Sequence, residues 1–116
     1  MANPRTLRIR DRCRELLAES RAHEEAGRTE LAWSCLVSAH ILGQRSTWLH
    51  VRSHVEMLGL AWRTQNRREV AGQMSRIAGA ALVTWLWVPE GNTGRANVSA
   101  FRPMPIPPEL QRLLKE

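Results

Sequence analysis

Hydrophobic and polar residues alternate with a helical period along most of the chain, in four successive segments. The first covers residues 5–26 and ends at Gly27, where a glycine readily adopts the left-handed backbone of a helix end. Thr29 can cap the second segment. Its predicted inward positions are Ala32, Trp33, Leu36, Ala39, His40 and Gly43. Since no strand pattern competes, we predict an all-α fold.

The third and fourth helical segments lie in the second half of the chain. Ser46 or Thr47 can cap the third, which is expected to end near Asn66, and the fourth covers residues 67–88 until Pro89 stops it. The inward stripe predicted for the third consists of Trp48, Val51, Val55, Leu58 and Trp62. The stripe predicted for the fourth consists of Val70, Met74, Ile77, Ala78, Ala81 and Trp85.

The connections between these segments are only a few residues long, which favours antiparallel neighbours in two helical hairpins. Gly27 and Asn66 occupy similar places between paired helices, at an offset of about 39 residues, close to the period of tetratricopeptide-like repeats. We therefore predict four main helices with a repeat-like hairpin geometry. A symmetrical four-helix bundle is the alternative.

Residues 89–108 contain most of the prolines and no periodic pattern, and a short terminal helix is predicted from Pro108 or Glu109. Phe101, Met104 and Ile106 are expected to anchor this extended segment on the helices, so that residues 1–116 form one domain.

A polar loop is predicted at the start of the same segment. Asn92, Thr93, Arg95 and Asn97 are interspersed with glycines there, so the loop is a candidate anion-binding or ligand-binding site, or a cap for helix ends.

Composition and charge narrow the class of protein. The chain is 43% hydrophobic, with a formal net charge of +6 and a pI near 11.2. Its densest arginine run, residues 8–14, is interleaved with and followed by carboxylates, which is typical of a solvated helix face. We therefore do not expect a nucleic-acid surface.

The most apolar run, residues 77–88, is about 18 Å of helix and too short to span a membrane. The N-terminus has no signal-peptide pattern, so a cytosolic protein with reduced cysteines is expected.

Three histidines have a spacing that indicates chemistry. His40 and His50 are equally far from Arg45, so they should lie level on two antiparallel helices, and His54 follows His50 by one helical turn, about 6 Å away. Neutral imidazole is a suitable ligand for zinc, copper, nickel and ferrous iron. We therefore predict a divalent transition-metal site.

The first helix offers alternatives for a fourth ligand: Glu19, Glu15 near the same level, and Cys13 on the apolar face. Histidines at the margin of a helical core that bind backbone carbonyls explain the same residues, and this alternative stays open. The chain has no recognisable catalytic motif, so an enzyme is not the expected class, although a small metal-dependent enzyme remains an alternative. A further alternative is a helical interaction module that binds a protein partner or forms a homodimer, because five tryptophans suit binding surfaces.

Three stretches carry a family resemblance: AHILGQ at residues 39–44, HVRSHVEML at residues 50–58, and GNTGRANVSAFRPMPIPPEL at residues 91–110. In these the chain resembles a small bacterial family defined as a domain of unknown function. Members of that family are encoded near metal-responsive regulators and cation-efflux genes, so the resemblance implies a link to metal handling and no established activity. It assigns no ligand or catalytic residue.

Overall fold

The computed structural model describes residues 2–84 and 86–116, and within them the chain is all-α, as predicted. Four main helices precede a short terminal one. The five helices are α1 (Pro4–Glu25), α2 (Thr29–Gly43), α3 (Thr47–Arg63), α4 (Arg67–Val83) and the terminal α5 (Pro108–Lys115).

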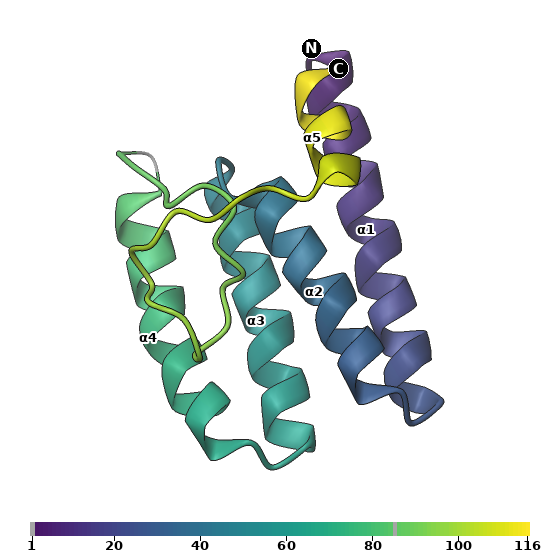
Figure 1. The fold of residues 1–116 in the computed structure, drawn as a ribbon, viewed down its shortest axis with the longest axis vertical. Coiled ribbons are helices and arrows are strands. Elements are labelled where there is room, and N and C mark those ends of the chain that lie inside the picture. Colours follow the sequence, from purple (N-terminus) through teal and green to yellow (C-terminus); the bar gives the residue numbers. More distant parts are fainter. Residues whose placement is uncertain (1, 85) are drawn as a thin grey trace.

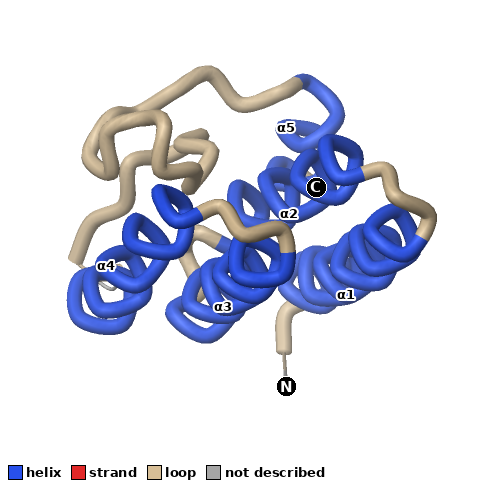
Figure 2. The backbone as a smooth tube through the Cα atoms, turned by 90° about the horizontal axis from the view of Figure 1, so that it is seen from below, coloured by secondary structure: helices blue, strands red, loops and turns tan. Residues whose placement is uncertain are grey.

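The four main helices form a row in chain order (Figures 1 and 2). α1 pairs with α2, α3 pairs with α4, and α2 and α3 join the two hairpins. Within the described residues α4 packs against no helix other than α3, whereas a closed four-helix bundle would also bring α4 against α1. The repeat-like arrangement is therefore the one adopted. α5 packs against α1 and α2.

Capping residues set most of the helix boundaries. Gly27 has φ +76° and ends the first hairpin's α1 as predicted, and the Ser46 hydroxyl accepts a hydrogen bond from the Leu49 amide at the start of α3. Asn66 has a different role from the one predicted. It begins α4, with its side chain accepting from the Glu69 amide, while Gln65 takes the left-handed conformation at φ 57°.

The inward faces of α3 and α4 are not the predicted apolar stripes. Trp48 is 70% exposed, Trp62 73% and Met74 61%. The residues buried on α3 are His50, Ser53, His54, Met57, Leu60 and Ala61. Those buried on α4 are Glu69, Gln73 and Ala80. Polar side chains turn inward here because each finds a hydrogen-bond partner there; Trp85, also predicted inward, lies outside the described residues.

The apolar core lies on both sides of α2, which explains why that helix is buried along most of its length. On one side Cys13, Leu16, Cys35, Ala39, Ile41, Leu42 and Leu110 pack together. On the other side Trp33 and Leu36 pack against Met57, Leu60 and Ala61 of α3. The histidines therefore extend a firmly packed α2–α3 interface.

After α4, which ends at Val83 and not at the predicted residue 88, the chain folds back across the helices (Figure 1). The Gln44 side chain accepts from the Gly91 amide and donates to the Pro89 carbonyl, which ties this return segment to the end of α2. Ile106 packs on the core and Met104 is half-buried. Phe101, predicted as an anchor, is 76% exposed instead.

Candidate metal centre

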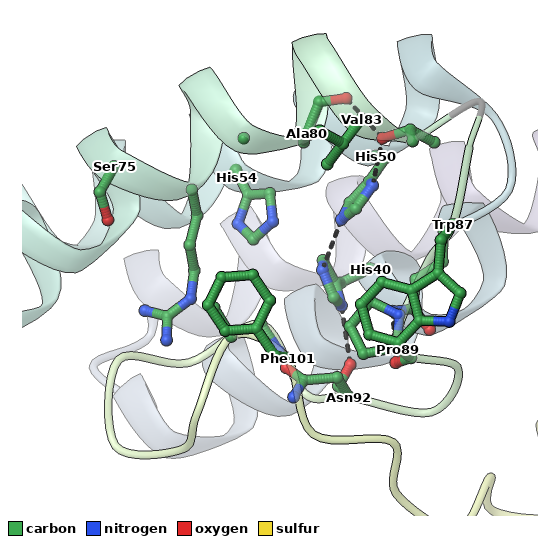
Figure 3. Close-up of a pocket in the computed structure, with 16 residues that line it drawn as sticks. His40, His50, His54, Ser75, Ala80, Val83, Trp87, Pro89, Asn92 and Phe101 are labelled. Atoms are coloured by element: carbon green, nitrogen blue, oxygen red, sulfur yellow. Dashed lines mark hydrogen bonds between the residues drawn. The ribbon is translucent and has the colours of Figure 1, made fainter.

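Three buried imidazoles meet between α2, α3 and the return segment (Figure 3). His40 projects from α2, and His50 and His54 from successive turns of α3. Their exposed fractions are 2%, 7% and 2%. The Nε2 atoms of His40 and His50 are 3.1 Å apart, and one ring nitrogen from each of the three lies within 4.8 Å of the others. This convergence agrees with the prediction that His40 and His50 lie opposite each other, equally far from the turn at Arg45.

The hydrogen-bond partners of His40 and His50 determine where their protons are. The Nδ1 atom of His40 lies 2.9 Å from the Asn92 carbonyl, which can only accept, so Nδ1 carries the proton. The Nδ1 atom of His50 lies 2.9 Å from the Thr84 hydroxyl. That hydroxyl gives its single hydrogen to the Ala80 carbonyl, so His50 must donate to it. Both Nε2 atoms are left with lone pairs.

His54 is oriented in the same way through Gln73. The Gln73 Nε2 atom donates to the Glu69 carboxylate and to the Gly94 carbonyl, which leaves its Oε1 atom facing His54. The Nδ1 atom of His54 lies 2.6 Å from that oxygen and must donate to it. All three histidines are thus held as Nδ1–H tautomers, with Nε2 available as a ligand atom.

Burial keeps the three rings neutral. It lowers the pKa of His50 to about 4, with a further contribution from His54, and it lowers the pKa of His54 to about 4, with Gln73 partly opposing the shift. The pKa of His40 also lies well below its ordinary range because of burial and the neighbouring rings. Neutral imidazole is the form that binds metal ions.

The separation of His40 and His50 is one that a single transition-metal ion could bridge. Two imidazole nitrogens on one tetrahedral zinc ion are about 3.3 Å apart, close to the 3.1 Å between His40 and His50. Without an ion or a shared proton, the same separation sets two lone pairs against each other. Each imidazole also donates its other nitrogen to a fixed acceptor, which is the usual outer shell of a histidine-metal site.

The predicted polar loop contributes Asn92 and Gly94 to the wall of this centre, and its side chains make hydrogen bonds within the chain. The Asn92 side chain donates to the Ser99 and Arg102 carbonyls and accepts from the Gly94 amide. Thr93 accepts from the Arg95 amide, and Asn97 is exposed. Asn92 is important through its backbone, because its carbonyl fixes the His40 tautomer.

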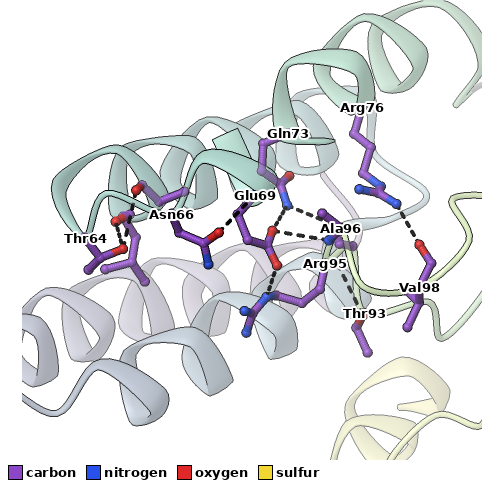
Figure 4. A network of polar contacts seen from close by, with 12 residues as sticks. Thr64, Asn66, Glu69, Gln73, Arg76, Thr93, Arg95, Ala96 and Val98 are labelled. Atoms are coloured by element: carbon purple, nitrogen blue, oxygen red, sulfur yellow. Dashed lines mark hydrogen bonds and ion pairs between the residues drawn. The ribbon is translucent and has the colours of Figure 1, made fainter. Parts of the chain in front are cut away.

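Arg95 is likewise engaged within the chain (Figure 4). Its guanidinium pairs with Glu69 and lies over the Trp33 ring at 3.9 Å. Burial alone raises the pKa of Glu69, but hydrogen bonds from Arg95, Gln73 and the Ala96 amide outweigh it and lower that pKa. Glu69 is therefore a carboxylate that connects Arg95 to the Gln73 amide and, through it, to His54.

A cavity of about 300 Å³ opens beside the histidines. All three imidazoles line it, and so do Arg76 of α4 and the side chains of Trp87 and Phe101 (Figure 3). A metal ion held by three histidines would thus keep a coordination position toward open space, as catalytic zinc sites do and closed structural sites do not.

The structure does not bring Glu19 or Cys13 to the imidazoles, which corrects the expectation of a fourth ligand from the first helix. Cys13 lies in the core on the other side of α2, with its Sγ atom against the Ala39 carbonyl. Glu19 pairs with Arg12. The cause is the helical period of α2: its face toward α1 is not the face that carries His40.

Sequence reasoning missed the residues that orient the imidazoles. The apolar pattern of residues 67–88 predicts that a different face of this helix is buried. Gln73 and Thr84 were therefore not among the predicted site residues. A signal was present: Glu69, Gln73, Arg76, Ala80 and Thr84 recur at helical spacing and form a stripe of mostly polar side chains.

The fold and the site together define an all-α protein with a buried cluster of three histidines that could hold a metal ion. No helix among the described residues is long and apolar enough to cross a membrane. A family described as "Protein of unknown function (DUF3703)" matches residues 8–114, and the chain belongs to this family. Comparisons with curated proteins and with solved structures gave no match.

Proposed function

We propose that this protein binds a divalent transition metal through the Nε2 atoms of His40, His50 and His54, in a cytosolic role in metal handling. The observation that carries the proposal is that three separate acceptors hold the three Nδ1 protons, which leaves an Nε2 lone pair on each of three imidazoles gathered in one buried place. Two core histidines can share one hydrogen bond between their ring nitrogens, but His40 and His50 both carry their protons on Nδ1, so neither Nε2 atom has a proton to share.

Direct metal titration tests the proposal. Chelator-stripped protein is titrated with zinc, cobalt, nickel and copper and followed by calorimetry, and the visible spectrum of cobalt reports the coordination geometry. We expect one ion per chain, bound far more tightly than the millimolar range. His50→Gln should weaken binding at least about tenfold. The matched control is His23→Gln, because His23 pairs with Arg28 and lies outside the cluster.

Binding no tighter than millimolar for all four ions would overturn the proposal, as would equal affinities for the protein and for His50→Gln. Circular dichroism of each variant establishes that the helices are intact.

A second candidate function is self-association. Residues 48, 51, 55, 58 and 62 of α3 alternate three and four apart, the spacing of a coiled-coil seam, and three of them, Trp48, Val55 and Trp62, are exposed. Val70 and Met74 of α4 line a groove together with Val55, Leu58 and Trp62, and Arg63, which also lines it, is paired with Glu24. The partner that suits this face is the same face of a second copy of the chain, because a symmetric dimer buries the apolar residues of both copies against each other.

Sedimentation equilibrium distinguishes this candidate from the metal site. A homodimer that Trp62→Glu dissociates would support it, with Leu31→Glu, at an exposed leucine of α2, as the control. A monomer at all protein concentrations would exclude it.

A further inference from the structure

Arg76 is the only charged side chain among the described residues that line the cavity. One terminal nitrogen of its guanidinium donates to the Val98 carbonyl at 2.8 Å (Figure 4), and its Nε atom is buried without an acceptor. No carboxylate in the described part of the chain forms an ion pair with it. A half-buried guanidinium whose Nε–H group has no acceptor destabilises the folded protein, unless a bound ligand supplies that acceptor.

The electrostatics around Arg76 are correspondingly positive. Burial lowers the pKa of Arg76, with Glu69 partly opposing the shift. The Glu69 oxygens, however, already accept from Arg95, Gln73 and the Ala96 amide. The Arg76 charge also acts on His40 and His54, where burial and Arg76 both disfavour the protonated rings.

A divalent ion on the three neutral imidazoles would add to this positive charge. Among the described residues, the cavity wall has no carboxylate to compensate for it. In a cavity of low dielectric constant, two neighbouring positive groups without an anion are strongly unfavourable. An anion that enters from outside would supply the missing negative charge.

We propose that the cavity binds a small organic carboxylate, with one oxygen on the open coordination position of the metal ion and the other paired with Arg76. This inference rests on the metal site proposed above. A carboxylate has the two-pronged shape that suits an ion on one side and a guanidinium on the other.

The rest of the wall defines the other end of the ligand. Ala80, Val83, Trp87, Ala100 and Phe101 make most of the cavity surface apolar. A volume of about 300 Å³ suits a short or compact hydrocarbon group attached to the carboxylate. A phosphate group, with more charge and more oxygens to satisfy, would find too few donors on this wall.

Titration of cobalt-loaded protein tests this inference. Propionate is added while the visible spectrum of cobalt is recorded, and propionamide serves as the uncharged ligand of the same shape. We expect a saturable spectral change with propionate and none with propionamide. Arg76→Gln should lower the affinity for propionate at least about tenfold. Arg76→Lys should lower this affinity less, because a positive charge remains. Arg68→Gln, at an exposed arginine of the same helix, should match the unmodified protein.

Three results would overturn the carboxylate site. These are no saturable change in protein that has bound cobalt, equal propionate affinity in Arg76→Gln, and tighter binding of inorganic phosphate than of propionate. Failure to bind cobalt at all is a different result, since it removes the metal site itself. The cobalt affinity of each variant is measured first, so the two failures are separated.

Discussion

His40 and His50 direct their Nε2 atoms at each other across 3.1 Å, although each ring donates its Nδ1 proton to a different acceptor. One acceptor is the Asn92 carbonyl of the return segment, and the other is the Thr84 hydroxyl at the end of α4. Two lone pairs at this distance repel, and a cation between them would remove that repulsion. His54 completes the cluster from the next turn of α3.

The metal-free protein should lose stability as the pH falls below about 6.5. Burial lowers the pKa of His50 and His54 to about 4, against about 6.5 in the unfolded chain, so between these values the unfolded chain binds protons that the folded chain does not. The free energy of unfolding should therefore fall with pH, by up to about 1.4 kcal/mol per pH unit for each of these two histidines, and their contribution should level off below about pH 4.

Urea unfolding of chelator-stripped protein at several pH values measures this slope. His54→Leu should reduce it because one titrating group is lost, whereas His23→Gln should leave it unchanged. A free energy of unfolding that stays constant from pH 6.5 to 4.5 would contradict the buried, neutral state of the rings.

Gly94 should not tolerate a side chain. Its φ is +80°, and a Cβ atom there would lie 2.9 Å from three atoms of the His40 ring. Gly94→Ala is expected to lower the free energy of unfolding by roughly 1–3 kcal/mol and to weaken metal binding, because His40 must move. Gly79→Ala is the matched control: it has open space around its Cβ position and should stabilise α4 by up to about 1 kcal/mol. Thermal unfolding and calorimetry with zinc compare the two variants.

Gln73 should control metal affinity without touching the ion. Its Oε1 atom accepts from His54, and its Nε2 atom donates to the Glu69 carboxylate and the Gly94 carbonyl. Gln73→Leu frees the His54 ring to rotate, so the affinity for zinc should fall about 10-fold to 100-fold. Ser75→Ala, at an exposed position of the same helix, should leave it unchanged. Equal affinities for these two variants would show that the Gln73 amide does not orient His54.

The Arg95–Glu69 ion pair should contribute more to stability than the Arg45–Glu90 pair. The Arg95 and Glu69 side chains are 19% and 4% exposed, and Arg95 also lies over the Trp33 ring. Lysine cannot reproduce the planar stacking, so Arg95→Lys should lower the free energy of unfolding by roughly 1–2 kcal/mol. Arg45 is 79% exposed, so Arg45→Lys should change the free energy of unfolding by less than about 0.5 kcal/mol. Chemical denaturation of both variants gives the comparison.

The sequence by itself determined the helices and the level of the histidines. Gly27 and Ser46 mark helix ends through their own backbone and side-chain chemistry, and a short turn at Arg45 necessarily sets His40 opposite His50. These are local relationships, so the period of 3.6 residues and the length of the turn are sufficient to predict them.

Only the tertiary structure decided which faces of α3 and α4 turn inward. Hydrophobic periodicity favoured the stripe from Trp48 to Trp62, yet the buried face carries His50 and His54, with Gln73 opposite on α4. Burial of polar groups depends on partners that are remote in the chain, here the carbonyls of Asn92 and Gly94 in the return segment. Because a helical pattern contains no information about such partners, the polar face that forms the site was settled by the hydrogen bonds of the folded chain.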